Sequence, residues 1–134
     1  MKKELSKTSA NKNIQNFEAQ FKKSTTQLLV LHFLSKEEMY AYDIIPKTLE
    51  LSNNVYKMPL LYNILNRLEE DNYIMQSRRE VSKTNRVRVY YKITSNGLQY
   101  LLDLKHCYMQ LSESVNNILF GEDSTTWIRL LINI

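Results

Sequence analysis

The chain of 134 residues contains little glycine, proline or cysteine. It has only two Gly and two Pro. Because these residues interrupt helices and favour turns, their scarcity predicts long helices joined by short loops. Its one cysteine, Cys107, excludes an intramolecular disulfide and a cysteine-based metal cluster. We expect Cys107 to be a small buried hydrophobic residue inside a helix, with a redox sensor as the alternative.

Long apolar segments and clusters of reactive side chains are also missing. No stretch approaches the roughly 18 apolar residues of a membrane-spanning helix, and no signal peptide is recognisable. We therefore expect a cytoplasmic protein that makes no contact with a membrane. The two histidines are too few for most metal sites, and neither a glycine-rich phosphate loop nor a Ser/His/Asp set can be identified. We expect no enzyme, no metal site and no cofactor.

The residues that are present predict one globular domain with a concentrated positive charge. Hydrophobic residues make up 43% of the chain, and its length allows a modest core that a second copy would enlarge. The net charge is +4, yet residues 78–92 alone hold six basic side chains and one acidic side chain. This local excess predicts a polyanionic partner. The alternative is an exposed hairpin edge that is kept basic to prevent aggregation.

An amphipathic helix is predicted over residues 58–72. The apolar side chains that recur at helical spacing are Leu61, Ile64, Leu65 and Leu68. Pro59 suits the first turn, where its missing N–H removes no hydrogen bond. Asn72 suits the end of the helix, because Asn tolerates the left-handed conformation.

A basic hairpin is predicted directly after this helix. Its first strand covers Tyr73–Val81, its turn covers Ser82–Asn85, and its second strand ends at Ile93. In the second strand, valine, tyrosine and isoleucine alternate with a basic set that includes Arg86 and Arg88, so one face is cationic. A helix followed by a basic hairpin is the layout of a winged helix-turn-helix. The helix would enter the major groove of DNA and the hairpin would contact phosphates.

Candidate DNA-binding residues lie on this helix and on the hairpin. They are Lys57, Met58, Tyr62, Asn63, Asn66, Arg67, Lys83, Asn85, Arg86 and Arg88. Side chains on the helix would read base edges, and the basic hairpin residues would hold the backbone. Tyr62 could instead be a half-buried helix residue, and Arg67 could pair with Glu70 or Asp71 at helical spacing.

The N-terminal part predicts an arm and then a core helix. Residues 1–13 are rich in Lys, Ser and Asn and predict a flexible basic arm, which is either solvated or adds a phosphate contact. A helical pattern begins at Ile14, and its segment 27–34 is apolar nearly all round, as in a central core helix. Pro46 cannot lie deep in a helix, so the next helix is expected to start late, with Asp43 as its N-cap.

Residues 94–134 are expected to form a dimerisation helix, capped by Thr94 or Ser95, and an apolar tail. Apolar residues alternate at intervals of three and four, as in a coiled-coil seam. The predicted seam is Leu101, Leu104, Tyr108, Leu111, Val115 and Ile118. The apolar surface of this helix is larger than one small domain can cover, so we expect the seam to pack against a second copy of the chain in a homodimer. The alternative is that the seam packs inside one chain. The tail Trp127–Ile134 is expected to pack on the dimer.

A set of motifs is spread along the chain: Leu61-Tyr62-x-x-Leu65-x-Arg67-Leu68-Glu69, Ile74, Tyr90-Tyr91-x-Ile93-Thr94-x-x-Gly97, and upstream Met39-Tyr40-Ala41-Tyr42-Asp43-Ile44. Together these motifs resemble the PadR family of bacterial transcriptional regulators. The resemblance covers residues 21–102. It implies that Tyr62 lies at the DNA face. It also implies a repressor, which in some members is released by a small aromatic or cationic effector near the dimer interface.

These expectations combine into one model. The fold is mainly α with a small β-hairpin wing (α+β), with a winged helix-turn-helix over residues 14–93 and a C-terminal dimerisation helix. The protein is expected to be a homodimeric repressor that reads a palindromic operator on double-stranded DNA through helix 58–72 and wing 74–93. The alternative is a winged-helix adaptor that binds another protein through its apolar C-terminal seam and tail.

Overall fold

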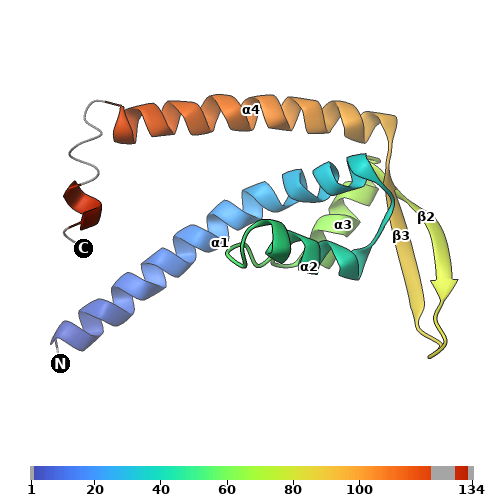
Figure 1. Ribbon diagram of the computed structural model, residues 1–134, viewed down its shortest axis with the longest axis horizontal. Helices are drawn as coiled ribbons and strands as arrows, with labels where there is room; N and C mark the ends of the chain where they lie inside the picture. The colour runs from blue at the N-terminus through green and yellow to red at the C-terminus, as the bar shows by residue number, and fades with distance from the viewer. Residues whose placement is uncertain (1, 122–128, 133–134) are drawn as a thin grey trace. The chain divides into compact units, whose positions relative to one another are not determined.

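The computed structural model describes residues 2–121 and 129–132, with side chains from residue 9 onward (Figure 1). The chain divides into two compact units, Met1–Leu101 and Leu102–Ile134. The elements in order are α1 (Lys2–Lys36), β1 (Met39–Tyr40), α2 (Ala41–Leu51), α3 (Leu61–Glu70), β2 (Ile74–Val81), β3 (Val87–Ile93) and α4 (Ser95–Phe120). The many helices and the small antiparallel sheet confirm the predicted α+β class. No helix within the described ranges is both long and apolar enough to cross a membrane.

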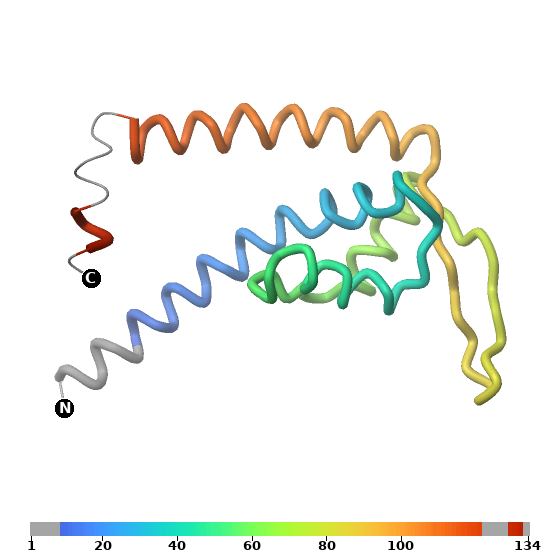
Figure 2. Tube along the Cα trace, viewed as in Figure 1, coloured from blue at the N-terminus to red at the C-terminus, as the bar shows by residue number. Residues whose placement is uncertain are grey.

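The core of the first unit lies where three helices meet the base of the sheet. The C-terminal half of α1 supplies the buried residues Val30 and Leu31, and Ile44 of α2 and Leu65 of α3 pack into the same core. In Figure 2, α2 and α3 lie beside this half of α1. The apolar segment of α1 is therefore the central core helix that the sequence predicts.

The prediction of a flexible arm over residues 1–13 is wrong from Lys2 onward, because these residues extend α1. The segment lacks Gly and Pro and contains Lys, Glu, Leu and Ala, which favour a helix. Farther along the same helix, Ile14, Phe17 and Phe21 are exposed. These three residues, here called the α1 stripe, are an apolar surface that the rest of the first unit leaves uncovered.

Helix α2 begins earlier than the sequence predicts. Tyr40, rather than Asp43, is its N-cap, and Pro46 lies inside the helix. The reason is a short strand pairing: β1 binds β3, with Tyr40 opposite Tyr90, and this fixes where the chain turns into α2. Because Pro46 has no N–H, the carbonyl of Tyr42 loses its helical hydrogen-bond donor.

Helix α3 begins later than predicted and ends as predicted. Leu60 precedes its first residue in the left-handed conformation, with φ of 46°, so Pro59 lies in the extended link rather than in the first turn. At the other end Asn72 has φ of 62°. An asparagine tolerates this conformation, which stops the helix and turns the chain into the hairpin.

The hairpin has the predicted strands and turn. The N–H of Ser82 donates to the carbonyl oxygen of Arg86 at 2.8 Å and closes the turn, in which Asn85 has a positive φ of 61°. The strand order is β1-β3-β2. A bulge between Gln76 and Arg78 shifts the register of β2 against β3. Figure 1 shows the hairpin extending beyond the helices of the first unit.

The junction between the hairpin and α4 is built from Thr94 and Gly97. The Thr94 hydroxyl accepts from the Gly97 N–H at 3.0 Å, which is an N-cap hydrogen bond as predicted. It also donates to the carbonyl oxygen of Asn72 at 2.6 Å. Gly97 lies against the Tyr73 carbonyl so closely that a Cβ atom there would overlap the oxygen and approach Ile93 Cγ1 to 2.7 Å.

We expect Gly97→Ala to lower the free energy of unfolding by about 1–3 kcal/mol, the usual range for overpacking. The added methyl group would meet backbone, which cannot move aside as a flexible side chain can. Urea denaturation followed by circular dichroism measures the change. A matched control is Gln110→Ala at an exposed site of the same helix, and equal effects of the two substitutions would contradict the prediction.

In the second unit, α4 exposes apolar side chains along its length. These are Leu102, Tyr108, Met109, Leu111, Val115, Ile118 and Leu119. Leu104 is half-buried, and Cys107 is exposed, which contradicts its predicted burial because no element of this unit covers that side. Leu101 is only 3% exposed. It is the last residue of the first unit and one helical turn after the buried Gly97, so it belongs to the core of that unit and not to a surface seam. Of the tail, residues 129–132 are described, and Trp127 lies outside the described residues.

Candidate nucleic-acid interface

Helix α3 presents a polar surface opposite its buried leucines. The exposed candidates on it are Tyr62, Asn63, Asn66 and Arg67. Lys57, in the extended link before the helix, is also exposed. Met58 differs: it is 8% exposed and belongs to the core, so the prediction that it contacts DNA is wrong. The residue before a proline is extended, and here that conformation turns the apolar side chain inward.

The link that leads into α3 is fixed to α1 by Tyr56. The Tyr56 hydroxyl lies 2.7 Å from Thr25 Oγ1 and 3.0 Å from Thr26 Oγ1. It also donates to the Lys22 carbonyl oxygen at 3.3 Å. These hydrogen bonds give the start of α3 a defined position against α1.

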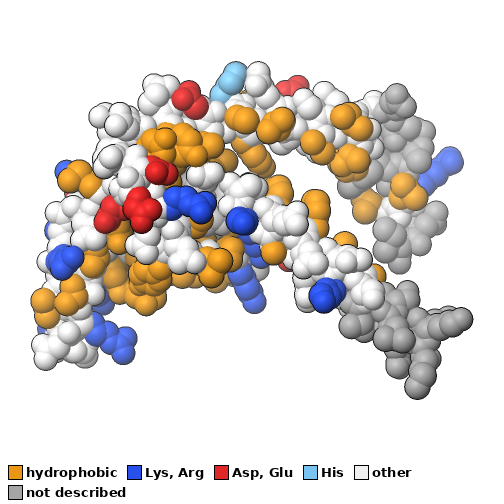
Figure 3. Space-filling view, turned by 180° about the vertical axis from the view of Figure 1, so that it is seen from behind, with side chains coloured by type: hydrophobic (Ala, Val, Ile, Leu, Met, Phe, Trp, Pro, Cys, Tyr) orange, Lys and Arg blue, Asp and Glu red, His pale blue; other side chains and the backbone are white. Residues whose placement is uncertain are grey.

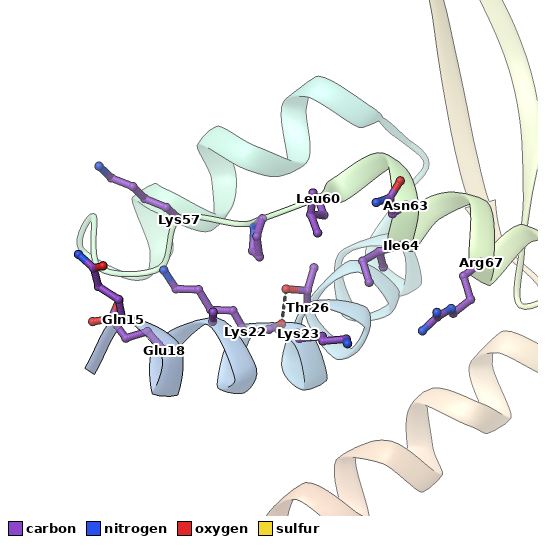
Figure 4. Close-up of a pocket in the computed structure, with 12 residues that line it drawn as sticks. Gln15, Glu18, Lys22, Lys23, Thr26, Lys57, Leu60, Asn63, Ile64 and Arg67 are labelled. Atoms are coloured by element: carbon purple, nitrogen blue, oxygen red, sulfur yellow. Dashed lines mark hydrogen bonds between the residues drawn. The ribbon is translucent and has the colours of Figure 1, made fainter. Parts of the chain in front are cut away.

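The Arg67 guanidinium is available to a ligand. Within the described part of the chain it makes no ion pair with Glu70 or Asp71, the alternative partners that helical spacing suggests. Figure 4 shows its side chain reaching from α3 toward α1. Arg67 therefore lies at the edge of the polar surface of α3, on the side that faces α1.

The hairpin carries its free cations near the turn. Lys83, Asn85, Arg86 and Arg88 are all exposed, and among the described residues none of the three basic ones forms an ion pair. Figure 3 shows Lys and Arg side chains standing out from this hairpin. The outer half of the wing is therefore a cationic surface without internal neutralisation.

The base of the hairpin is different, because Arg78 is neutralised there. Its Nη1 lies 2.8 Å from Glu80 Oε1, and its Nε lies 3.8 Å from Glu38 Oε2. Its guanidinium also lies 4.1 Å from the centre of the Tyr90 ring, and the Tyr90 hydroxyl donates to Glu80 at 3.1 Å. We call these four residues the Arg78 cluster. It ties the wing to the turn between α1 and α2.

A row of four tyrosines joins the wing to α3. Ring centres lie 6.0 Å apart for Tyr90 and Tyr40, 5.4 Å for Tyr40 and Tyr42, and 5.7 Å for Tyr42 and Tyr62. The guanidinium of Arg88 lies 5.4 Å from the Tyr40 ring. The sequence alone places Tyr40 and Tyr42 only at a helix start. Their position in this row depends on the pairing of β1 with β3, which no local pattern reveals.

Tyr62 is held as a neutral phenol. Partial burial and the neighbouring Tyr42 side chain raise the pKa of Tyr62 well above its ordinary value. The exposed fraction of Tyr62 is 47%, so solvent still reaches the ring. A neutral hydroxyl can donate a hydrogen bond to a phosphate or base oxygen, which a phenolate cannot do.

Stability is expected to fall as the pH rises above about 10, the ordinary tyrosine pKa. Burial also raises the pKa of Tyr91 and of Tyr100. The folded state therefore keeps protons that the unfolded state loses above that pH. Urea unfolding at pH 9 and pH 11 tests this. Tyr62→Phe should reduce the loss, whereas Tyr108→Phe, outside the tyrosine row, should not; equal behaviour of the two variants would contradict the assignment.

Comparison with known families and structures gives matches over this unit. Residues 30–103, more than half of the chain, match the "Transcriptional regulator PadR-like family". The chain belongs to the PadR family. The matched range includes α2, α3 and the whole wing, so the resemblance seen in the sequence motifs is confirmed. PadR-family homologues are transcriptional regulators and not enzymes.

Solved PadR-like structures share this architecture. A PadR-like transcriptional regulator from Bacillus cereus is 29% identical, covers 77% of this chain and 99% of its own, and superposes with a TM-score of 0.64. Bacillus subtilis PadR, solved in complex with operator DNA, is 26% identical with a TM-score of 0.54, over 60% of this chain and 46% of that one. An uncharacterised protein from Lysinibacillus sphaericus is 28% identical over 95 residues, which cover 69% of this chain and 86% of that protein.

Proposed function

We propose that this PadR-family protein is a homodimeric repressor that binds a palindromic operator through α3 and the wing. The observation that carries the proposal is the exposed polar surface of α3 beside a wing whose basic side chains Lys83, Arg86 and Arg88 have no acidic partner among the described residues. The operator complex of Bacillus subtilis PadR supports the same kind of target. A DNA target places the protein in the cytoplasm.

The side chains of α3 and of the wing suit different contacts with DNA. Asn63 and Asn66 can each form paired hydrogen bonds with an adenine edge in the major groove. Tyr62 and Lys57, at the start of α3, suit contacts with bases or backbone near the groove edge. Arg86 and Arg88 suit phosphates, which position the protein without reading sequence.

The apolar surfaces on two helices support dimerisation. Tyr108, Leu111, Val115 and Ile118 are exposed along α4 in the single chain, and the α1 stripe is a second uncovered apolar surface. Figure 3 shows hydrophobic side chains following α4. Exposed apolar patches of this extent mark interaction sites, and a coiled-coil spacing suits an identical helix. A symmetric dimer would place two α3 helices about one DNA turn apart, which requires a palindromic site.

The proposal is tested with a pool of genomic DNA fragments at several salt concentrations. Three or four basic contacts per subunit should give a slope of log K against log salt of about −5 to −7 for a dimer. Bound fragments should share a palindrome, and the protein should block transcription from a promoter that contains it. Weak binding with little salt dependence would reject DNA as the ligand. The exposed α4 surface would then favour the adaptor alternative, in which another protein is bound.

A further inference from the structure

A cavity of about 510 Å³ lies between α1 and the start of α3. Cavities of this size hold small molecules. Figure 4 shows Lys22 at the end of the cavity where Glu18 lies, and Lys57 on the link with its side chain directed away from α1. At the other end, Lys23 and Arg67 point toward each other. The cavity lies within the first unit, and its walls are held together by the Tyr56 hydrogen bonds to α1.

The lining combines an apolar floor with an excess of positive charge. Ala19, Pro59, Leu60 and Ile64 supply apolar surface. The lining includes four cations and one carboxylate, Glu18, and among the described residues none of the four cations forms an ion pair. Uncompensated cations beside a low-polarity surface attract an anion strongly and repel a cation. The cationic effector that the family resemblance implies therefore does not suit this cavity.

We propose that this cavity binds a small organic anion, with an apolar body and a phosphate or similar group of two negative charges, and that the bound anion weakens DNA binding. The proposal that an anion binds depends only on the cavity. The second part rests on the proposed function, because three candidate DNA-binding residues, Lys57, Asn63 and Arg67, also line the cavity.

Shared side chains provide the coupling between the two ligands. A bound anion would neutralise Lys57 and Arg67, which are then lost as phosphate contacts. The start of α3 also has no side-chain cap, and its N-cap Leu60 is in the left-handed conformation. A non-glycine residue in this conformation is strained, so the first turn of α3 is open to small displacements by a neighbouring ligand.

The first test is a titration of ¹⁵N-labelled protein with 1-naphthyl phosphate, followed by amide NMR shifts. An aryl phosphate carries nearly two negative charges at pH 8. We expect saturable shifts at Ala19, Asn63 and Ile64. Binding should be at least about fivefold tighter than that of 1-naphthol, which lacks the charge, or of inorganic phosphate, which lacks the apolar body. Shifts confined to α4, no shifts, or equal affinity for all three probes would overturn the proposal.

Variants locate the site without removing a candidate DNA contact. Lys23→Gln should weaken 1-naphthyl phosphate about fivefold, and Ala19→Phe should abolish binding by filling the cavity. Both positions lie on α1, and Ala19 is exposed, so the phenylalanine has room to fold. Lys12→Gln, an exposed site of α1 outside the cavity, is the matched control. Equal affinities for the Lys23 and Lys12 variants would overturn the proposal.

The second test measures DNA affinity at saturating 1-naphthyl phosphate. Wild-type protein should lose at least about tenfold in affinity, and Ala19→Phe should lose none. DNA binding that is unaffected by the bound anion would overturn the regulatory part. A protein with no DNA affinity would instead overturn the proposed function, whereas the NMR titration decides anion binding independently.

Discussion

Replacing Arg86 and Arg88 with alanine is expected to weaken operator binding about a hundred- to a thousandfold at 0.15 M salt. The two side chains are exposed on the outer half of the wing. Glu80, opposite Arg88 in the hairpin, is occupied by Arg78. Removing two phosphate contacts per subunit removes four per dimer, so the slope of log K against log salt should become shallower by about 3 to 4. Fluorescence anisotropy of labelled DNA at several salt concentrations measures both quantities.

The matched control removes the same charge from another exposed surface. Lys23→Ala/Lys36→Ala takes two cations from α1, and both sites are exposed. If the wing contacts phosphates directly, this control should leave the slope nearly unchanged. A slope that falls equally in both double variants would mean that net charge alone attracts DNA, and it would reject a specific role for the wing.

Replacing Leu111 and Val115 with lysine is expected to convert the proposed dimer into monomers at micromolar concentration. Both residues are exposed on α4 in the single chain, and both lie on the predicted seam. Burying such side chains contributes about 1.5 kcal/mol or more each. Four of them per dimer give about 6 kcal/mol, which is more than a 10⁴-fold change in the dissociation constant. Sedimentation velocity measures the oligomeric state, and operator affinity should fall with it.

The control for this prediction adds the same charge to the other side of the helix. Gln110 and Asn117 are exposed, and helical spacing places them on the side of α4 away from the seam. Gln110→Lys/Asn117→Lys should therefore remain dimeric. A monomeric wild-type protein, or equal dissociation of both variants, would contradict the seam as the dimer interface. Such a result would leave α4 as a surface for a different partner.

The elements best predicted from the sequence are those that depend on the spacing and type of neighbouring residues. The leucines of α3, Asn72 after it, and the turn at Ser82–Asn85 are all where the sequence places them. Each depends on residues within a few positions, so a single stretch of sequence contains the information. The N-cap Thr94 is predictable for the same reason.

Local sequence patterns do not show which apolar residues are buried by an element that is distant in the sequence. Met58 and Leu101 fit a surface by local pattern, but the fold buries both. The tyrosine row likewise requires β1 to pair with β3, which joins residues about fifty positions apart. The same limit explains α2: without this pairing nothing shows that the helix begins at Ala41, so Pro46 could not be placed inside it.

The two halves of the wing differ in what they contribute to folding. The Arg78 cluster uses its charges within the protein, so substitutions there alter the attachment of the wing to its body. The side chains of residues 83–88 are exposed, and among the described residues Lys83, Arg86 and Arg88 form no ion pair. If the wing binds DNA as proposed, we expect mutations at these outer positions to change operator affinity without lowering stability. Under the proposed function, operator occupancy can be adjusted through these outer residues while the residues of the Arg78 cluster maintain the attachment of the wing.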